Sequence, residues 1–303
     1  MKFEEIAPLP FIFFFIFLMI YPLILSLSMI SFKDALTLFG DELYIRSLKN
    51  LFIFIGVAVP VKLVLALFIS AILSGFRRNP IVKLLGVIYP LPWAIPAMSA
   101  ALSFRWSLNY DFGIVNKMLV DLGLWKIPWL LTYPTAMLSI ILFHVWKWTP
   151  LWTLMLFSAR QAIPEELYEV AKIDGASLFQ VFKNVTFPLI RNTFLVCLLL
   201  SSVWSMGEFE AIWLVTMGDP NASTRTITTL GFREIFAYGN LGKGIAMYFS
   251  VFPVVVAVMV SIIFILRRNL EKTRSPNFFY STNFDYMDVI SCIQYDCDIT
   301  FNI

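Results

Sequence analysis

The chain has 303 residues, of which 59% are hydrophobic and only 14% are charged, and its mean hydropathy is +0.79. A single water-soluble core cannot bury this much apolar surface, which excludes a soluble enzyme, a DNA-binding domain and a small secreted domain held by disulfides. The net charge of +3 is too small to indicate nucleic acid as a partner. The composition predicts a protein embedded in a lipid bilayer.

Long apolar runs divide the chain into six predicted transmembrane helices. Each run is long enough to cross the bilayer, because about 20 helical residues span its roughly 30 Å hydrocarbon layer. In chain order they cover residues 11–30, 51–74, 84–104, 135–157, 193–215 and 244–266. The formal charges within them are Lys62, Lys147, Glu208 and Glu210. We therefore predict an all-α, polytopic membrane protein with no room for a sizeable soluble domain.

Charge placement predicts the side of the membrane on which the termini lie. Six spans put both termini on one side, and Arg77-Arg78 and Arg267-Arg268 stand directly at the ends of the second and sixth spans. Cations that flank a span favour the cytoplasmic side. We therefore expect cytoplasmic termini, with residues 1–10 forming a short cytoplasmic segment.

The third span contains three prolines, Pro90, Pro92 and Pro96. Each proline removes a backbone donor and clashes with the preceding turn, so a regular helix cannot run through this segment. We expect a kink or a break. Irregular backbone at membrane depth survives where protein or a water-filled cavity covers it, so the break is either the wall of a cavity or a distortion near the membrane surface.

Residues 163–188, between the fourth and fifth spans, read as a helix, a turn and a second helix. Pro164 suits the first position of a helix, and Gly175 suits a left-handed turn at its end. Apolar residues then recur at helical spacing until Pro188, which we expect to stop the run. Exposed apolar residues need a cover, so this hairpin either docks into a groove of a soluble partner or folds back on its own membrane domain.

Polar and aromatic residues line one face of each of the two neighbouring spans. The fourth span contributes His144, Lys147, Trp148, Leu151 and Trp152, and the fifth contributes Ser201, Trp204, Ser205 and Glu208. Charges inside a membrane are costly, so Lys147 and Glu208 should face water, a partner helix or one another. Indole faces suit the C–H side of a sugar ring, and the hydroxyl and carboxyl groups suit its hydroxyls. The alternative is that these side chains serve as packing and gate.

Lys62, in the second span, has no obvious role in the sequence. It either extends toward the membrane surface or pairs with Glu210.

The end of the chain changes in composition. Residues 275–303 lose apolar periodicity, and we expect disorder after a membrane domain that covers 11–274. The cysteines are too few for a disulfide framework, and no metal-ligand spacing accompanies them: Cys197, Cys292 and Cys297.

The hairpin resembles the EAA loop of ABC importer permeases. In that loop Glu-Ala-Ala is followed after three residues by Gly and after nine more by Ile-x-Leu-Pro. Here the matching residues are Glu169, Ala171, Gly175, Val185 and Phe187-Pro188, and each departure keeps apolar character. The flanking Asp174 and the segment Ile163-Pro-Glu-Glu-Leu-Tyr-Glu look like the sugar-importer branch, the maltose/trehalose and glycerol-phosphate type. Further matches to that branch are Asn50, Gly113-Ile-Val-Asn116, Trp129-Leu130, Leu214-Val-Thr216 and Gly218-Asp-Pro220.

The resemblance, which covers about residues 5–272, implies a type I ABC importer permease. Two such subunits form the path, two cytoplasmic ATPase subunits bind the EAA loops, and an extracytoplasmic solute-binding protein delivers sugar. The coupling loop spans 160–190, with Glu169, Ala171, Asp174, Gly175 and Pro188 as its matched residues. ATP-driven closure would push this loop as a lever and shift the fourth and fifth spans.

The chain has no phosphate loop of the GxxxxGK type; the nearest string, Gly242-Lys243-Gly244, lacks the following Ser or Thr. We therefore expect a transport subunit and no enzyme, with no cofactor of its own and with ATP and magnesium bound by the partner. In the resembled permeases, substrate contacts match His144, Lys147, Trp148, Leu151, Ser201, Trp204, Ser205 and Glu208. The alternative is a self-sufficient facilitator or an ion-coupled carrier, which would need coupling sites among the few intramembrane charges.

Overall fold

A computed structural model describes residues 13–75 and 79–274, and in this part of the chain every regular element is helical. The apolar runs of the sequence form long helices, and proline and glycine mark the places where these helices start, bend or end. In chain order the elements are the π-helical turn η1 (Ile16–Ile20), α3 (Tyr21–Ser28), α4 (Phe32–Leu38), α5 (Glu42–Gly75), α6 (Pro80–Ile88), α7 (Leu91–Ala94), α8 (Ala97–Ser107), α9 (Ile114–Asp121), α10 (Thr135–Gln161), α11 (Glu165–Ile173), α12 (Leu178–Val181), the π-helical turn η2 (Phe182–Thr186), α13 (Phe187–Met206), α14 (Glu210–Val215), α15 (Ile227–Phe236) and α16 (Leu241–Arg274).

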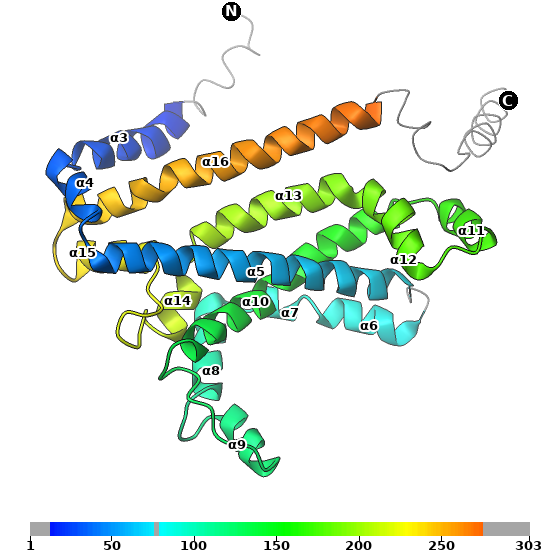
Figure 1. The fold of residues 1–303 in the computed structure, drawn as a ribbon, viewed down its shortest axis with the longest axis horizontal. Helices are drawn as coiled ribbons and strands as arrows, with labels where there is room; N and C mark the ends of the chain where they lie inside the picture. Colours follow the sequence, from blue (N-terminus) through cyan, green and yellow to red (C-terminus); the bar gives the residue numbers. More distant parts are fainter. Residues whose placement is uncertain (1–12, 76–78, 275–303) are drawn as a thin grey trace, which may run out of the picture.

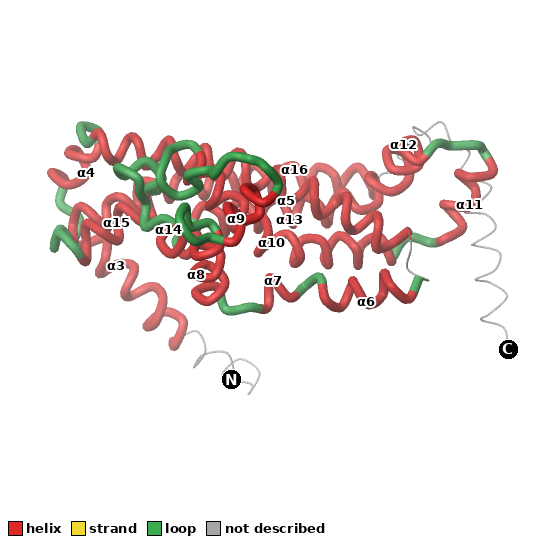
Figure 2. Tube along the Cα trace, turned by 90° about the horizontal axis from the view of Figure 1, so that it is seen from below, coloured by secondary structure: helices red, strands yellow, loops and turns green. Residues whose placement is uncertain are grey.

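Four helices in the described residues are long and apolar enough to cross a membrane: Glu42–Gly75, Thr135–Gln161, Leu178–Met206 and Leu241–Asn269. A bent pair, Pro80–Ala94 with Ala97–Ser107, raises the number to five if it counts as one span. Figure 1 shows the long helices running along the long axis, with α11 and α12 at one end and α4 and α15 at the other. The same two ends are separated in the perpendicular view of Figure 2.

The first predicted span is shorter in the structure than in the prediction. A helix covers Phe13–Ser28, and residues 11 and 12 lie outside the described part. None of the residues of η1 or α3 is buried in the chain. This helix therefore presents apolar side chains on all sides, as expected of a segment surrounded by lipid or by other subunits. The predicted disorder of 275–303 falls outside the described residues.

The predicted break in the third span is confirmed. The helices on either side of Ile95 and Pro96 meet at a bend of 94°. Ile95 has an extended backbone that ends α7, and Pro96 precedes the first residue of α8. Proline disfavours the helical region for the residue before it, so Ile95-Pro96 favours an end of the helix here. Pro60, Pro150 and Pro253 stay inside continuous helices, so a proline alone does not force such a break.

The prediction that Pro188 ends a helix is wrong. The chain remains helical from Leu178 to Met206, and Pro188 lies in the first turn of α13, directly after η2. Proline is tolerated in the first turn of a helical segment, and the wider π-helical turn before it relieves the clash with the preceding carbonyl groups. The fifth predicted span, 193–215, is itself interrupted at residues 207–209, between α13 and α14.

The core lies where α5, α10 and α13 pack together. Val59, Leu63 and Ala66 of α5 form one buried cluster with Trp152 and Leu156 of α10 and Cys197 of α13. A second cluster joins α5 to α15 and α16 through Leu51, Leu230 and Met247, at the end of the molecule where α4 and α15 lie. These apolar contacts hold the three central helices side by side and place their polar residues between them.

Candidate translocation path and coupling hairpin

The predicted helix, turn and helix after α10 is present. α11 ends at Ile173, and Gly175 adopts a left-handed backbone with φ of +71°. Its N–H donates to the carbonyl of Lys172 over 3.0 Å, and the N–H of Ala176 donates to the carbonyl of Ala171 over 3.0 Å. These bonds close the end of α11 in the manner typical of a glycine C-terminal cap. We call residues 163–188 the coupling hairpin.

The second arm of the coupling hairpin has its own start signal. Ser177 and Gln180 form a reciprocal capping box, in which the Ser177 hydroxyl accepts from the N–H of Gln180 over 3.4 Å and the Gln180 side chain accepts from the N–H of Ser177 over 2.7 Å. This motif fixes the direction of the chain as it enters the second arm. The turn is thus defined on both sides by local chemistry.

The tip of the coupling hairpin exposes large apolar side chains. Ile173 is 84% exposed, Leu178 is 91% exposed and Phe179 is 71% exposed. Nearer the base, Ala171 and Val185 are buried, and Tyr168 lies 3.3 Å from Thr186 between their hydroxyl oxygens. The base is therefore packed within the chain, whereas the tip is uncovered. The alternative in which the hairpin folds back on its own membrane domain therefore describes the base, and docking of the tip into a soluble partner stays a prediction.

The remaining matched loop residues, Glu169, Asp174, Gly175 and Pro188, are exposed on the coupling hairpin. The structure brings them to the same end of the molecule as the apolar tip (Figure 1).

Arg160, in the last turn of α10, connects the coupling hairpin to the membrane helices. Its Nε donates to Ser70 Oγ on α5 over 3.1 Å, and its guanidinium carbon lies 5.8 Å from the centre of the Phe182 ring. A guanidinium above an aromatic face is attractive, and the contact here is half-buried. A displacement of the hairpin would therefore reach α5 as well as α10 and α13.

A polar network crosses the centre of the bundle. Lys62 Nζ of α5 donates to Nε2 of His144 on α10 and to Ser205 Oγ on α13, each over 2.8 Å. His144 Nδ1 lies 2.8 Å from Oε2 of Glu208. Lys62 is 1% exposed and His144 is 2% exposed. The contacts fit a neutral imidazole whose Nε2 accepts from the ammonium and whose Nδ1 lies beside the carboxylate.

Glu208 also organises the interruption between α13 and α14. Its Oε1 accepts from the N–H of Ala211 in the first turn of α14 over 2.9 Å, and its backbone carbonyl accepts from Thr228 Oγ1 of α15 over 2.7 Å. A carboxylate at a helix N-terminus satisfies a free donor there. The central network is thus connected to the break in the fifth span.

Lys147 does not join this network. Its Nζ donates to the carbonyl groups of Pro92, Trp93 and Ile95, at 3.2, 3.4 and 2.7 Å. These are carbonyls released at the end of α7 by the break in the third span. An intramembrane cation that caps free carbonyls is less costly than one without a partner. Lys147 therefore stabilises the break, and of the alternatives that the sequence left open it faces a neighbouring helix, not Glu208.

A group of tryptophans lies beside the central network. The ring centres of Trp148 and Trp204 are 5.6 Å apart, and those of Trp152 and Trp204 are also 5.6 Å apart. Trp204 is 48% exposed, whereas Trp152 is buried. Among the described residues, neither Trp152 Nε1 nor Ser201 Oγ has a hydrogen-bond partner. This face of α10 and α13 therefore combines aromatic surface with unused polar groups.

The structure thus divides the predicted path residues into groups. His144, Ser205 and Glu208 share one network, Trp148 and Trp204 contact one another, and Leu151 packs with the apolar cluster around Trp152. Lys62, which has no obvious role in the sequence, contacts His144 and Ser205, so its suggested pairing with Glu210 is wrong. The signal that identifies Lys62 is its charge alone, since a lysine at membrane depth requires a partner.

Motif residues outside the hairpin shape the opposite end of the molecule. Asn50 Nδ2 donates to the carbonyls of Ser223 and Arg225, each over 2.8 Å, and so fixes the loop before α15. Asn116 exchanges hydrogen bonds with the backbone of Ile127 over 3.0 Å in both directions and accepts from Trp129 Nε1 over 3.2 Å. A buried asparagine with all groups paired holds a loop in one arrangement.

The fold agrees with solved permeases. An ABC transporter involved in the import of the acidic polysaccharide alginate matches with a TM-score of 0.76 and 26% identity, over 88% of this chain and 95% of that chain. The same kind of transporter in complex with an alginate pentasaccharide-bound periplasmic protein matches with a TM-score of 0.72 and 25% identity, over 89% and 93% of the two chains.

Sequence relatives agree with the structural matches. The trehalose/maltose transport system permease protein MalF of Thermococcus litoralis is 35% identical over 210 residues, 69% of each chain. The sulfoquinovosyl glycerol transport system permease protein SmoG of Agrobacterium fabrum is 28% identical, over 80% of this chain and 78% of the relative. The family model for binding-protein-dependent transport system inner membrane components matches residues 8–275. The chain belongs to this family, and it is a membrane-embedded permease subunit of an ABC importer.

Proposed function

We propose that this subunit forms half of the translocation path of an ATP-driven carbohydrate importer. The relatives supply the substrate class: their names include trehalose/maltose, sulfoquinovosyl glycerol and alginate. The proposed assembly contains a second permease subunit, two cytoplasmic ATPase subunits and an extracytoplasmic solute-binding protein. ATP and magnesium bind to the ATPase subunits, and this chain contributes no cofactor.

The observation that carries the proposal is the coupling hairpin, with its uncovered apolar tip on a packed base. Burying Ile173, Leu178 and Phe179 in a groove of a soluble partner is favourable, because their apolar surface is exposed to water in the isolated chain. The helix of the second arm continues without interruption into α13. A partner that grips the tip therefore holds the end of a membrane helix.

The proposed path runs along the face of α10 and α13 that carries Trp148 and Trp204. Aromatic rings contact the apolar face of a sugar. Ser201 Oγ and Trp152 Nε1 are buried without a partner in this conformation, and they become candidates for hydrogen bonds to sugar hydroxyls once α13 moves away from α10. Movement of α13 relative to α10 would open this face to one side of the membrane and then to the other. Lys147 supports the path indirectly by holding the break in the third span.

The proposed orientation places the coupling hairpin and both termini in the cytoplasm. Arg267 and Arg268 lie near the end of α16 that is on the same side as α11 and α12 (Figure 1). This placement agrees with the preference of flanking cations for the cytoplasmic side.

Transport by the reconstituted complex tests the proposal. The permease pair and its ATPase are placed in proteoliposomes with the binding protein, and uptake of a panel of mono- and disaccharides is measured with and without ATP. We expect uptake of at least one saccharide that requires both ATP and the binding protein. Uptake that proceeds without ATP and follows a proton or sodium gradient would favour an ion-coupled carrier, with the Lys62–His144–Glu208 network as its coupling site.

A further inference from the structure

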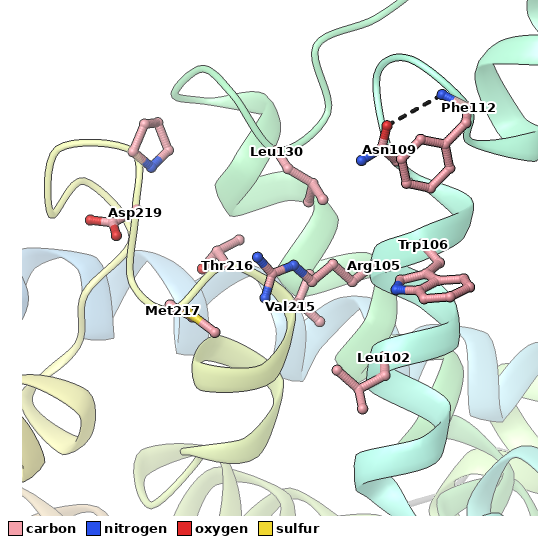
Figure 3. Close-up of a pocket in the computed structure, with 11 residues that line it drawn as sticks. Leu102, Arg105, Trp106, Asn109, Phe112, Leu130, Val215, Thr216, Met217 and Asp219 are labelled. Carbon is pink, nitrogen blue, oxygen red and sulfur yellow. Dashed lines mark hydrogen bonds between the residues drawn. The ribbon is translucent and has the colours of Figure 1, made fainter.

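A pocket of about 500 Å³ lies between α8 and the segment that follows α14 (Figure 3). Its volume is in the range of small-ligand sites. None of the path residues on α10 and α13 lines it. The pocket is therefore separate from the path proposed above.

The wall formed by residues 215–220 is held from behind. Thr216 Oγ1 lies 2.9 Å from Thr224 Oγ1 and accepts from the N–H of Gly218 over 3.2 Å. Asn50 fixes the same loop from α5 through the carbonyls of Ser223 and Arg225. Side chains paired in this way define a fixed surface, as a binding site requires.

Two polar side chains on one side of the pocket offer free hydrogen-bond donors. Arg105 extends from α8 across the pocket toward Val215 and Thr216 (Figure 3), and among the described residues its guanidinium has no hydrogen-bond or ion-pair partner. Asn109 uses its Oδ1 to accept from the backbone N–H groups of Asp111 and Phe112, at 2.9 and 3.3 Å. The Nδ2 amide of Asn109, which also lines the pocket, therefore remains available to donate.

The acidic group in the wall is already compensated. Asp219 lies 3.4 Å from Arg225 and 3.9 Å from Arg233, measured from carboxylate oxygen to guanidinium nitrogen. Asp219 carries one negative charge, whereas Arg225 and Arg233 carry two positive charges. A net positive charge therefore remains near Arg105, which is itself unpaired among the described residues. This balance favours an anionic ligand, because a guanidinium binds a planar carboxylate through two parallel hydrogen bonds.

Aromatic rings form the rim of the pocket. Trp106 and Phe112 are exposed, and their rings meet edge to face with centres 6.5 Å apart. Exposed aromatic surface beside a cation and an amide donor suits a ring with an apolar face, hydroxyl groups and a carboxylate.

We propose that this pocket binds an acidic saccharide, with Arg105 on its carboxylate, Asn109 Nδ2 on a ring hydroxyl and Trp106 against its apolar face. The inference rests on the proposed carbohydrate function and adds a substrate class, the uronic acids, and a second contact point ahead of the membrane path.

Direct binding measures this site without contribution from the solute-binding protein. The intact complex of permease pair and ATPase is placed in lipid nanodiscs, and saturation-transfer NMR titrations are recorded with digalacturonate and with neutral digalactose. We expect digalacturonate to bind about tenfold more tightly than digalactose, the value of one charge-assisted hydrogen bond. Arg105→Gln should remove this preference, and Trp106→Ala should weaken binding of both disaccharides.

The matched control is Lys117→Gln, which removes an exposed cation from α9 outside the pocket and should leave both titrations unchanged. Each variant is first checked for an unchanged unfolding midpoint.

The inference would be overturned by equal binding of the two disaccharides, by no binding of digalacturonate, or by wild-type binding by Arg105→Gln. The inference would also be overturned if Arg105→Gln bound both disaccharides like the wild type and lost only the stimulation of the ATPase by the binding protein. The pocket would then hold an acidic side chain of that protein. ATP-driven uptake of neutral sugars by the same preparation reports separately on the proposed function.

Discussion

Lys62, His144 and Glu208 place two opposite charges inside the membrane domain with an imidazole between them. Desolvation of each ion is costly, and the hydrogen bonds to His144 and Ser205 offset that cost only while the whole network is present. A network of this kind specifies one relative position of the helices that carry it. The central network therefore sets the register of α5, α10 and the end of α13.

Removing one charge from this network should lower the free energy of unfolding more than removing both charges. Lys62→Met and Glu208→Gln should each lower the free energy of unfolding by about 3–5 kcal/mol, because the remaining ion is left buried without its partner. The double variant should recover most of that loss. Denaturant unfolding of the purified subunit in detergent measures the three differences.

The control for the charge network is Lys83→Met, which removes an exposed lysine from α6. It should change the unfolding free energy by less than about 0.5 kcal/mol. Single variants as stable as the wild type would mean that water or lipid reaches the network and screens its charges.

Asp41 connects the start of α5 to α15 and α16, at the end of the bundle opposite the coupling hairpin. Its Oδ2 lies 2.7 Å from Lys243 Nζ, which also donates to Glu234 over 2.9 Å, and its Oδ1 accepts from the N–H groups of Leu43 and Tyr44 at the start of α5. Burial raises the pKa of Asp41, but the hydrogen bonds from Lys243, Tyr44 and Leu43 outweigh burial, so the pKa lies below its usual value of 3.8.

A lowered carboxyl pKa stabilises the fold above the pKa of the unfolded chain, and the contribution disappears as the pH falls through the folded-state pKa. Asp41→Asn should therefore lower the unfolding midpoint at neutral pH. The difference from wild type should begin to shrink as the pH falls through the usual value of 3.8, and it should vanish only below the lower folded-state pKa. The ion pair is partly exposed, so its contribution is less than about 1 kcal/mol. Thermal unfolding of both proteins between pH 3 and pH 7 gives the comparison.

Asp41→Ala separates the two roles of the side chain. Asparagine is as good an N-terminal cap as aspartate, whereas alanine removes the cap as well and should cost about 1 kcal/mol more at every pH. Identical midpoints for the Asn and Ala variants would show that Asp41 does not cap α5.

Two of the membrane helices are interrupted, and a charged side chain compensates each interruption. Lys147 caps the carbonyls at the end of α7, and Glu208 accepts from the N–H of Ala211 at the start of α14. Cations suit the C-terminal end of a helix and anions suit its N-terminal end, so both signs agree with the helix dipole. Lys147 and Glu208 thus stabilise broken helices, and this explains why these two charges are tolerated at membrane depth.

The coupling hairpin should lose its partner without losing its fold when its tip becomes polar. Leu178→Ser and Phe179→Ser remove apolar surface that the isolated chain leaves exposed. We expect each substitution to weaken binding of the ATPase by about tenfold, the typical effect of truncating an anchor residue, and to leave the unfolding midpoint unchanged. Copurification of the ATPase with the permease at graded concentrations measures the loss.

Phe236→Ser is the matched control for the hairpin tip. Phe236 is 73% exposed at the end of α15, on the side of the molecule opposite the hairpin. It should leave binding of the ATPase intact. Retention of the ATPase by both tip variants would show that the apolar tip is not the docking surface.

Local chemistry decided which features of the whole molecule were predictable from the sequence. The break at Ile95-Pro96 follows from the backbone of proline, and the turn at Gly175 follows from the freedom of glycine at positive φ. The interruption at residues 207–209 was missed because tertiary contacts fix it, including the bond from Thr228 Oγ1 to the carbonyl of Glu208. No pattern in the neighbouring sequence indicates that bond.

In the candidate path, the sequence predicted which residues share a helix face but not which residues they contact. Helical spacing brought His144 and Trp148 onto one face of α10. The partner of each charge depends on how three helices pack, so the sequence did not identify Lys62 as the partner of His144 or the carbonyls around Pro92 as the partners of Lys147. Side-chain pairing across a bundle is set by the fold as a whole.

At the scale of the whole molecule, the two ends of the bundle should lie on opposite sides of the membrane. The coupling hairpin lies at one end, and α8, α9 and α14 lie toward the other (Figure 1). Cysteines introduced at the exposed positions Lys172 on α11 and Asp121 on α9 report on these ends. In a variant with Cys292→Ser and Cys297→Ser the remaining Cys197 is buried, so the background labelling is low.

A membrane-impermeant maleimide should label Asp121→Cys in intact spheroplasts and Lys172→Cys only after permeabilisation. The reverse pattern would place the hairpin outside the cell, where a cytoplasmic ATPase has no access to it, and coupling through its apolar tip would then be impossible.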